Sequence, residues 1–160
     1  LATPEGDREW SVNVVDLPSD MEQVWLVIGF TGEALPTGKM VAEVAQRLKD
    51  EPELKAEMDA IARITLAGLT ALSAGNMEAV GMAMDACHQK LRLIGVSSPS
   101  LEALVEAVGP HALGAKLTGA GGGGCMIALA REPQRVAEAI EIAGGRPLIS
   151  KLGASGVHLL

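Results

Sequence analysis

A run of glycines is the feature of this sequence that most clearly indicates chemistry. Five of the six residues from Gly119 to Gly124 are glycine, and the sixth, Ala120, carries only a methyl group. Backbone amides without side chains can approach a ligand closely, and a series of them can cradle an anionic group such as a phosphate. Each interior glycine also destabilises a fold by about 0.5–1 kcal/mol relative to alanine. A run of this length therefore favours a binding role over a simple turn.

Three structures could use such a run. The first is a hairpin turn with redundant glycines, since the flanking segments 113–117 and 125–130 are strand-like. The second is a nucleotide loop: Gly119, Gly121 and Gly124 satisfy G-x-G-x-x-G, but that motif must open a helix, and Cys125 stands where a P-loop needs lysine. The third is a backbone cradle at a binding site, which fits both the hairpin context and the number of glycines.

The other polar residues give weaker signals. Asp85 and His88 are three apart on a predicted helix, so we expect a surface pair, with a substrate contact as the alternative. His111 is expected to be exposed in a turn and His158 to lie at the margin of the sheet. Lys116 is equally well explained as a solvated charge at a strand end or as a ligand contact. We expect no metal site and no catalytic side chain in this chain.

Composition limits the classes of protein to consider. The chain has 160 residues, a net charge of −7, one Phe, two Trp and no Tyr. It therefore needs an aliphatic core, and it has neither the basic footprint nor the aromatic faces that nucleic-acid binding uses. No uncharged stretch reaches the ~20 residues of a membrane span. Cys87 and Cys125 have no metal-ligand spacing, so we expect reduced thiols in a cytoplasmic protein.

The hydrophobic pattern predicts an α+β fold, with an antiparallel sheet covered by helices on one face. The predicted strands cover residues 10–15, 24–30, 113–117, 125–130, 147–151 and 157–160. Helices are predicted over 38–48 and 52–72. Three more are expected to begin at the capping residues Asn76 and Ser98 and near Pro133, the last ending before Gly144.

Four segments together resemble the C-terminal domain of the GHMP kinases. "KLTGAGGGGCMIAL" (116–129) resembles the third conserved motif of that family, in the form typical of mevalonate kinases. "TGEALPTGKMVAEV" (31–44) is similar to the segment that enters the C-terminal domain, and "HQKLRLIGVSSPSLEALVEAV" (88–108) to the helix–loop–helix before the third motif. "KLGASGVHLL" (151–160) resembles the closing strand, so the resemblance covers nearly the whole chain.

The resemblance implies a ferredoxin-like domain that supplies one wall of an active-site cleft. The expected substrate and phosphate contacts are Thr37, Thr118, Gly119, Ala120, Gly121, Gly122, Gly123 and Gly124. ATP and Mg²⁺ would be bound mainly by an N-terminal domain with a Ser/Gly-rich loop, and nothing in this chain resembles that loop. We therefore expect residues 1–160 to be a single domain cut from a longer protein, as the start at Leu1 also indicates.

The implied activity is ATP-dependent phosphorylation of mevalonate to 5-phosphomevalonate in isoprenoid biosynthesis, with the isolated chain inactive. Phosphomevalonate, homoserine or galactose kinases remain alternatives within the family, and a non-catalytic ligand-binding or interaction module is an alternative outside it. Loss of the N-terminal domain would expose an apolar face, so the chain could form a homodimer. In the complete protein, Gly121→Val is expected to lower turnover while leaving the fold largely intact.

Overall fold

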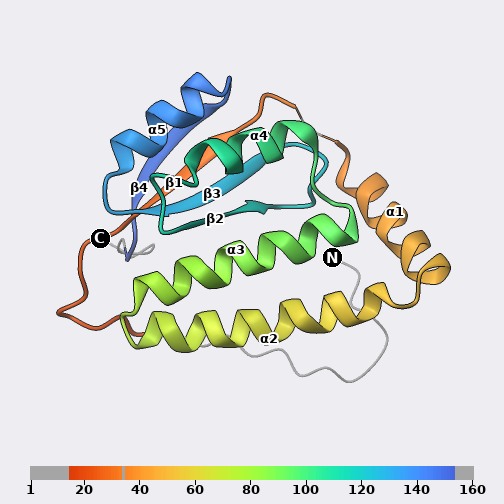
Figure 1. Cartoon of the computed structure of the whole chain (residues 1–160), viewed down its shortest axis with the longest axis horizontal. Helices are drawn as coiled ribbons and strands as arrows, with labels where there is room; N and C mark the ends of the chain where they lie inside the picture. Colours follow the sequence, from red (N-terminus) through yellow and green to blue (C-terminus); the bar gives the residue numbers. More distant parts are fainter. Residues whose placement is uncertain (1–14, 34, 154–160) are drawn as a thin grey trace, which may run out of the picture.

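The computed structural model describes residues 15–33 and 35–153 of the chain. Its four strands are β1 (Trp25–Phe30), β2 (Gly114–Thr118), β3 (Cys125–Ala130) and β4 (Arg146–Lys151). The described helices are α1 (Thr37–Asp50), α2 (Leu54–Ser73), α3 (Met77–Ile94), α4 (Pro99–Val108) and α5 (Pro133–Ile142). Every neighbouring pair of strands is antiparallel, in the order β2-β3-β1-β4 (Figure 1). This arrangement confirms the predicted α+β, ferredoxin-like fold.

Local sequence signals explain where several of these elements begin and end. The Asn76 side chain accepts a hydrogen bond from the backbone N–H of Ala79 at 3.0 Å and so caps α3. Ser98 does the same for α4, with Pro99 in the first turn. Gly144 follows α5 with φ +87°, a left-handed conformation that glycine adopts without a steric penalty. The predicted caps are therefore confirmed.

The main core lies between one face of the sheet and the helices α4 and α5 (Figure 1). Alternate residues of each strand face these helices, and the register sets Leu117 beside Met126 and Ala128 beside Val27. The largest fully buried side chains are all aliphatic or methionine, as the composition predicted. Each buried leucine contributes about 1.5–3 kcal/mol of hydrophobic stabilisation.

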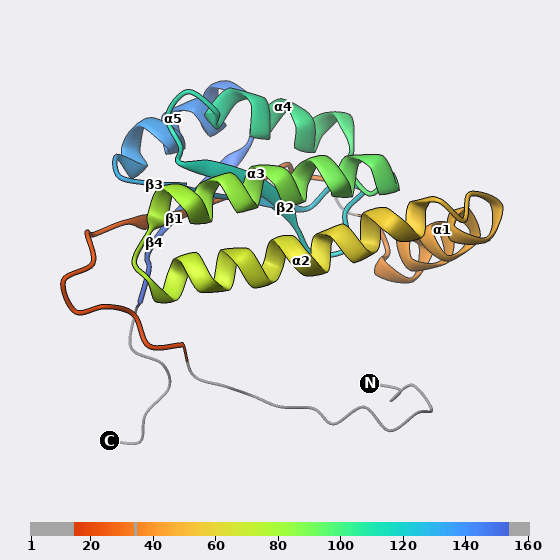
Figure 2. The ribbon, with the colours of Figure 1, turned by 60° about the horizontal axis from the view of Figure 1, so that its bottom comes forward.

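The helices α2 and α3 form a long antiparallel pair beside the edge strand β2 (Figure 2). Met77 and Val80 of α3 pack on Leu129, on the sheet face opposite α4 and α5, so helices cover both faces and the prediction of helices on one face was wrong. At one point α3 comes very close to β2. A Cβ on Gly81 would lie 2.1 Å from the carbonyl oxygen of Leu113, and a Cβ on Gly114 would lie 2.0 Å from that of Gly81.

The predicted elements within the described residues are all present, with ends that differ by a few residues. The strand predicted over 157–160, and all but Val15 of the one predicted over 10–15, lie outside the described residues. In the part of the chain that the structure describes, no helix has the length and apolar character needed to cross a membrane.

The close contact between α3 and β2 predicts that Gly81→Ala destabilises the chain. Alanine would favour the isolated helix by about 1 kcal/mol, but its Cβ would overlap backbone atoms that cannot rotate away. We expect a net loss of about 1–3 kcal/mol in the free energy of unfolding, measured by urea denaturation. Gly38→Ala is the matched control: Gly38 is also helical, and a Cβ there meets nothing within 4 Å. Equal midpoints for the two variants would contradict the prediction.

Candidate functional site

The glycine loop joins β2 to β3, and its conformation explains its composition. All five glycines between Gly119 and Gly124 have positive φ, from +71° to +132°. A residue with a side chain is disfavoured in this region by about 1–2 kcal/mol, so the loop requires glycine at every one of these positions. Redundant glycines in a simple hairpin turn would not need this conformation. The backbone conformation of the loop thus explains why these five residues are glycine.

Two segments that are distant in sequence hold the loop in place. The Gly122 N–H donates to the carbonyl of Val96 at 2.8 Å, and the Gly124 N–H donates to the carbonyl of Glu33 at 2.6 Å. These two amides are therefore occupied inside the protein, and they hold the loop in place. Among the described residues, no acceptor is present for the amides of the other four loop residues, Gly119, Ala120, Gly121 and Gly123.

A concavity of about 360 Å³ opens beside the loop. Its lining combines the two predicted parts of the site, the loop and Thr37, and none of the described lining residues is charged. The lining residues are Leu35, Thr37, Thr118, Gly119, Ala120, Gly121, Gly123, Gly124 and Cys125. Gly122 is the one predicted contact outside this list, since it packs toward Leu35 and Met40. Leu35 and Cys125 were missed by sequence reasoning; only the position of Cys125 next to the loop could have indicated it.

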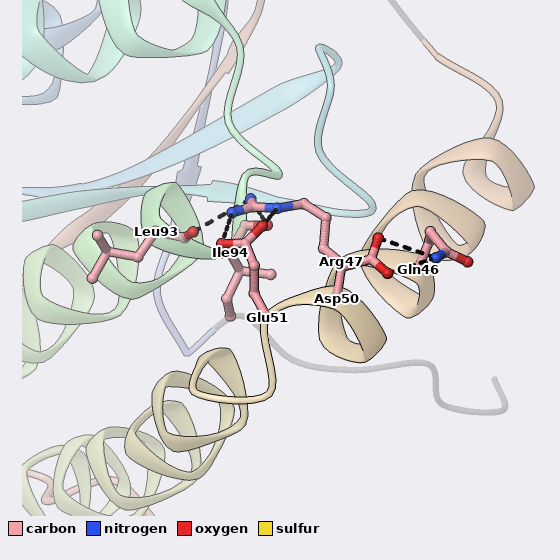
Figure 3. Close-up of polar contacts among 6 residues, drawn as sticks. All are labelled: Gln46, Arg47, Asp50, Glu51, Leu93 and Ile94. Carbon is pink, nitrogen blue, oxygen red and sulfur yellow. Dashed lines mark hydrogen bonds and ion pairs between the residues drawn. The ribbon is translucent and has the colours of Figure 1, made fainter.

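Thr37 begins helix α1, which packs on the core through Met40 and Val44 and is tied to α3 by Arg47 (Figure 3). The Arg47 guanidinium donates to the carbonyl of Ile94 at 2.6 Å, at the C-terminal end of α3, and pairs with Glu51 at 3.1 Å. A cation at a helix C-terminus interacts favourably with the helix dipole. The hydrogen bond to Glu51 raises the pKa of Arg47. Sequence reasoning missed this residue, since an arginine on an exposed helix gives no distinctive signal.

A second, apolar cleft of about 430 Å³ lies between the α2–α3 pair and the end of β2. Its walls include Ile61, Met84, Cys87 and Leu91, and Thr118 and Gly119 line both this cleft and the loop concavity. The start of the glycine loop therefore forms a ridge between a neutral, amide-lined hollow and an aliphatic one.

Lys116 also lines the apolar cleft. Its Nζ donates to the carbonyl of Leu117 at 2.8 Å, so the amine is bound to its own strand. Lys116 and Thr118 lie on the sheet face opposite Leu117, as the alternation of a strand predicted.

Asp85 and His88 are not the surface pair that the sequence predicted, and neither is placed as a substrate contact. Asp85 Oδ1 accepts from the backbone N–H of Ala115 at 2.7 Å, and His88 Nδ1 accepts from that of Leu117 at 3.3 Å. These two amides lie on the outer edge of β2, where no further strand supplies acceptors. Residues i and i+3 of α3 thus pair with the amides of residues i and i+2 of the strand. Side chains of helix α3 thus accept hydrogen bonds from the backbone amides on the open edge of β2, the strand that leads into the loop.

His88 is 2% exposed and sits at the centre of a polar network. Its Nε2 lies 3.2 Å from Glu102 Oε1, although the angle is poor for a hydrogen bond. Glu102 also contacts Arg92 at 2.9 Å and accepts from the Ser97 hydroxyl. Burial lowers the pKa of His88, an effect that the Glu102 carboxylate partly offsets. Neutral His88 can accept from Leu117 through Nδ1 only when its proton is on Nε2.

Two further histidines and the two cysteines are the remaining candidate residues. His111 is exposed, as predicted, and His158 lies outside the described residues. Cys87 and Cys125 are both free thiols. Within residues 15–33 and 35–153, no group of three or more His, Cys, Asp and Glu residues could hold a metal ion.

The fold and the loop define a ferredoxin-like domain with a glycine loop beside a neutral concavity, and comparison with known proteins identifies its family. Residues 69–146 match the family model for the C-terminal domain of GHMP kinases. A curated mevalonate kinase from Pyrococcus furiosus is 39% identical over 142 residues, which cover 84% of this chain and 42% of that protein. The chain therefore carries the C-terminal domain of the GHMP kinases, and it spans about two fifths of the length of this relative.

Solved structures agree with this assignment. The crystal structure of L. major mevalonate kinase in complex with R-mevalonate matches with a TM-score of 0.72 and 31% identity, covering 82% of this chain and 40% of that one. Streptococcus pneumoniae phosphomevalonate kinase in complex with phosphomevalonate and AMPPNP matches with a TM-score of 0.75 over 91% of this chain and 44% of that one. At 22% identity, the second match shows the common fold alone.

The His88 network predicts that stability depends on pH. Because the folded-state pKa of His88 is lowered, the unfolded chain binds more protons between that pKa and the ordinary value of about 6.5. The free energy of unfolding should therefore fall as the pH drops from 7 to 5, by at most about 1.4 kcal/mol per pH unit for one proton. In His88→Gln, whose side-chain oxygen can still accept from Leu117, urea denaturation should show a flatter profile. An unchanged profile would contradict this account.

Proposed function

We propose that this chain is the substrate-side part of a mevalonate kinase, which transfers the γ-phosphoryl group of ATP to the primary hydroxyl of mevalonate in the cytoplasm. The observation that carries the proposal is the set of four loop amides without internal acceptors, which lie in an uncharged concavity together with Thr37. The family relationship and the L. major complex with R-mevalonate support the choice of substrate.

The proposed role of the loop follows from the charge of the transferred group. Phosphoryl transfer is accelerated mainly by positioning and by stabilising negative charge on the phosphoryl oxygens. Fixed N–H groups in a neutral hollow can donate to such oxygens without rearranging, and the Thr37 hydroxyl adds a further polar group at the same rim. Within this proposal, ATP and Mg²⁺ are bound mainly by an N-terminal domain, which also supplies the acid–base groups.

Within this proposal, the apolar cleft packs against either the carbon skeleton of the substrate or the surface of the N-terminal domain. It is lined by aliphatic side chains and adjoins the loop at Thr118 and Gly119. Leu66 and Leu69 on α2 are 65% and 44% exposed, more than apolar side chains of a fully covered helix would be. A domain that packs over α2 and the loop would bury both the cleft and these side chains.

Restoring the missing part tests the proposed function directly. The chain should be fused behind the N-terminal part of the Pyrococcus furiosus mevalonate kinase and assayed for ATP-dependent phosphorylation of mevalonate, with the isolated chain as the control. We expect turnover with the fusion and none with the chain alone. Turnover with phosphomevalonate, homoserine or galactose in place of mevalonate would reassign the substrate.

A non-catalytic binding module is the alternative that a second measurement excludes. Calorimetry on the isolated chain should detect no submicromolar binding of mevalonate or its phosphorylated forms in the absence of ATP. Tight binding without ATP, combined with an inactive fusion, would replace the kinase by a ligand-binding module.

The space around each loop glycine decides which substitution can test the proposed catalytic role of the loop. Gly121→Val, first expected to leave the fold intact, is unsuitable, because a Cβ on Gly121 would lie 2.1 Å from the carbonyl oxygen of Val96. A Cβ on Gly119 meets nothing within 4 Å, so Gly119→Ala adds a methyl group at the ridge of the site at a conformational cost of about 1–2 kcal/mol. In the fusion we expect kcat/KM to fall at least about tenfold, equivalent to about 1.4 kcal/mol of transition-state stabilisation.

Gly144→Ala is the matched control for this variant. Gly144 has a similar φ of +87° and open space around its Cβ, but it lies beyond α5 and lines neither concavity. Its thermal stability should fall as much as that of Gly119→Ala while kcat/KM stays near the unmodified value. A similar loss of activity in both variants would remove the loop from the mechanism.

A further inference from the structure

A short turn, Thr31-Gly32-Glu33, is hydrogen-bonded to the end of the glycine loop. The carbonyl of Gly124 accepts from the backbone N–H of Thr31 at 2.9 Å, while the N–H of Gly124 donates to the carbonyl of Glu33 at 2.6 Å. Both backbone groups of this loop residue are therefore fixed by a segment 93 residues away in sequence. Gly123, next to it, is enclosed by the same turn, because a Cβ there would lie 3.0 Å from the Glu33 carbonyl oxygen.

The Thr31 hydroxyl lies at the centre of this contact. Its Oγ1 is 3.1 Å from the carbonyl oxygen of Gly124 and 3.2 Å from that of Glu33, and it accepts from the Glu33 N–H at 3.2 Å. A hydroxyl has one proton, so it donates to one of the two carbonyls while accepting from the amide. When it donates to the nearer carbonyl, that of Gly124, it links the turn to the loop, which an isosteric apolar side chain could not do.

The turn is itself anchored to the body of the domain. The Glu33 carboxylate accepts from the Ser100 hydroxyl at 2.6 Å, in the first turn of α4. A carboxylate is favoured at a helix N-terminus by the helix dipole. Glu33 therefore ties the turn, and with it the end of the loop, to α4.

We propose that Thr31 is a positioning residue for the phosphoryl-binding loop: its hydroxyl holds Gly123 and Gly124 in the conformation in which they line the loop concavity. This inference rests on the proposed function. It assigns no contact between Thr31 and a ligand, because Thr31 does not line the concavity. Removing the hydroxyl loosens the loop, and the fixed N–H groups lose the preorganisation on which charge stabilisation depends.

The test compares Thr31→Val with Thr31→Ser in the fusion enzyme. Thr31→Val should lower kcat about fivefold or more, the equivalent of one lost hydrogen bond, with a smaller change in the KM for mevalonate. Thr31→Ser keeps the hydroxyl and should restore kcat. The matched control is Thr70→Val, where an exposed hydroxyl bonds only to the carbonyl of Leu66 in its own helix.

Two outcomes would overturn the inference. One is an unchanged kcat in Thr31→Val. The other is an equal loss in Thr31→Val and Thr31→Ser that follows their melting temperatures, which would indicate a purely structural turn. If the fusion phosphorylates a different alcohol, the proposed substrate fails while the comparison of the variants still stands.

A second measurement on the 160-residue chain applies even if the fusion does not assemble. Amide hydrogen exchange, followed by NMR, should be about fivefold faster at Gly124 in Thr31→Val than in the unmodified chain. Exchange at Gly122 should not change, because its amide is held by Val96. Equal exchange at Gly124 in the two chains would show that the hydroxyl does not hold the loop.

Discussion

Backbone hydrogen bonding along β2 and the glycine loop is the constraint on which the rest of the structure depends. β2 is an edge strand, so its outward amides need acceptors that no neighbouring strand provides. Asp85 and His88 supply these acceptors from α3, and farther along the chain Val96 and Glu33 supply them for the loop. Four loop amides have no acceptor among the described residues, and all four of their residues line the concavity.

Some amides of the loop hold it in place, and others have no acceptor among the described residues. The amides of Gly122 and Gly124 fix the loop, so the four amides without an acceptor among the described residues are held in position. Preorganised donors stabilise developing charge more effectively than donors that must first be ordered. The contacts come from the 31–33 turn, the loop after α3 and the first turn of α4. The position of the site thus depends on segments that carry none of its predicted binding residues.

Close approaches of backbone to backbone define the geometry as much as polar contacts do. Gly81 and Gly114 let α3 lie directly against β2, which brings Asp85 and His88 within reach of the strand amides. Arg47 performs a comparable task for α1, because it ties that exposed helix to the end of α3. Gly122 also packs toward Leu35 and Met40, on either side of Thr37 in the sequence.

The sequence by itself determined the elements, their caps, the antiparallel hairpin around the loop and the family, because these follow from local periodicity and from a motif of unusual composition. It also predicted that Thr37 and the loop belong to one site, and both line the same concavity. It could not show that Asp85 and His88 bind strand amides, that Gly81 is a contact point, or that Gly122 and Gly124 are internally bonded. Each of these depends on which distant backbone groups meet, and only tertiary packing decides that.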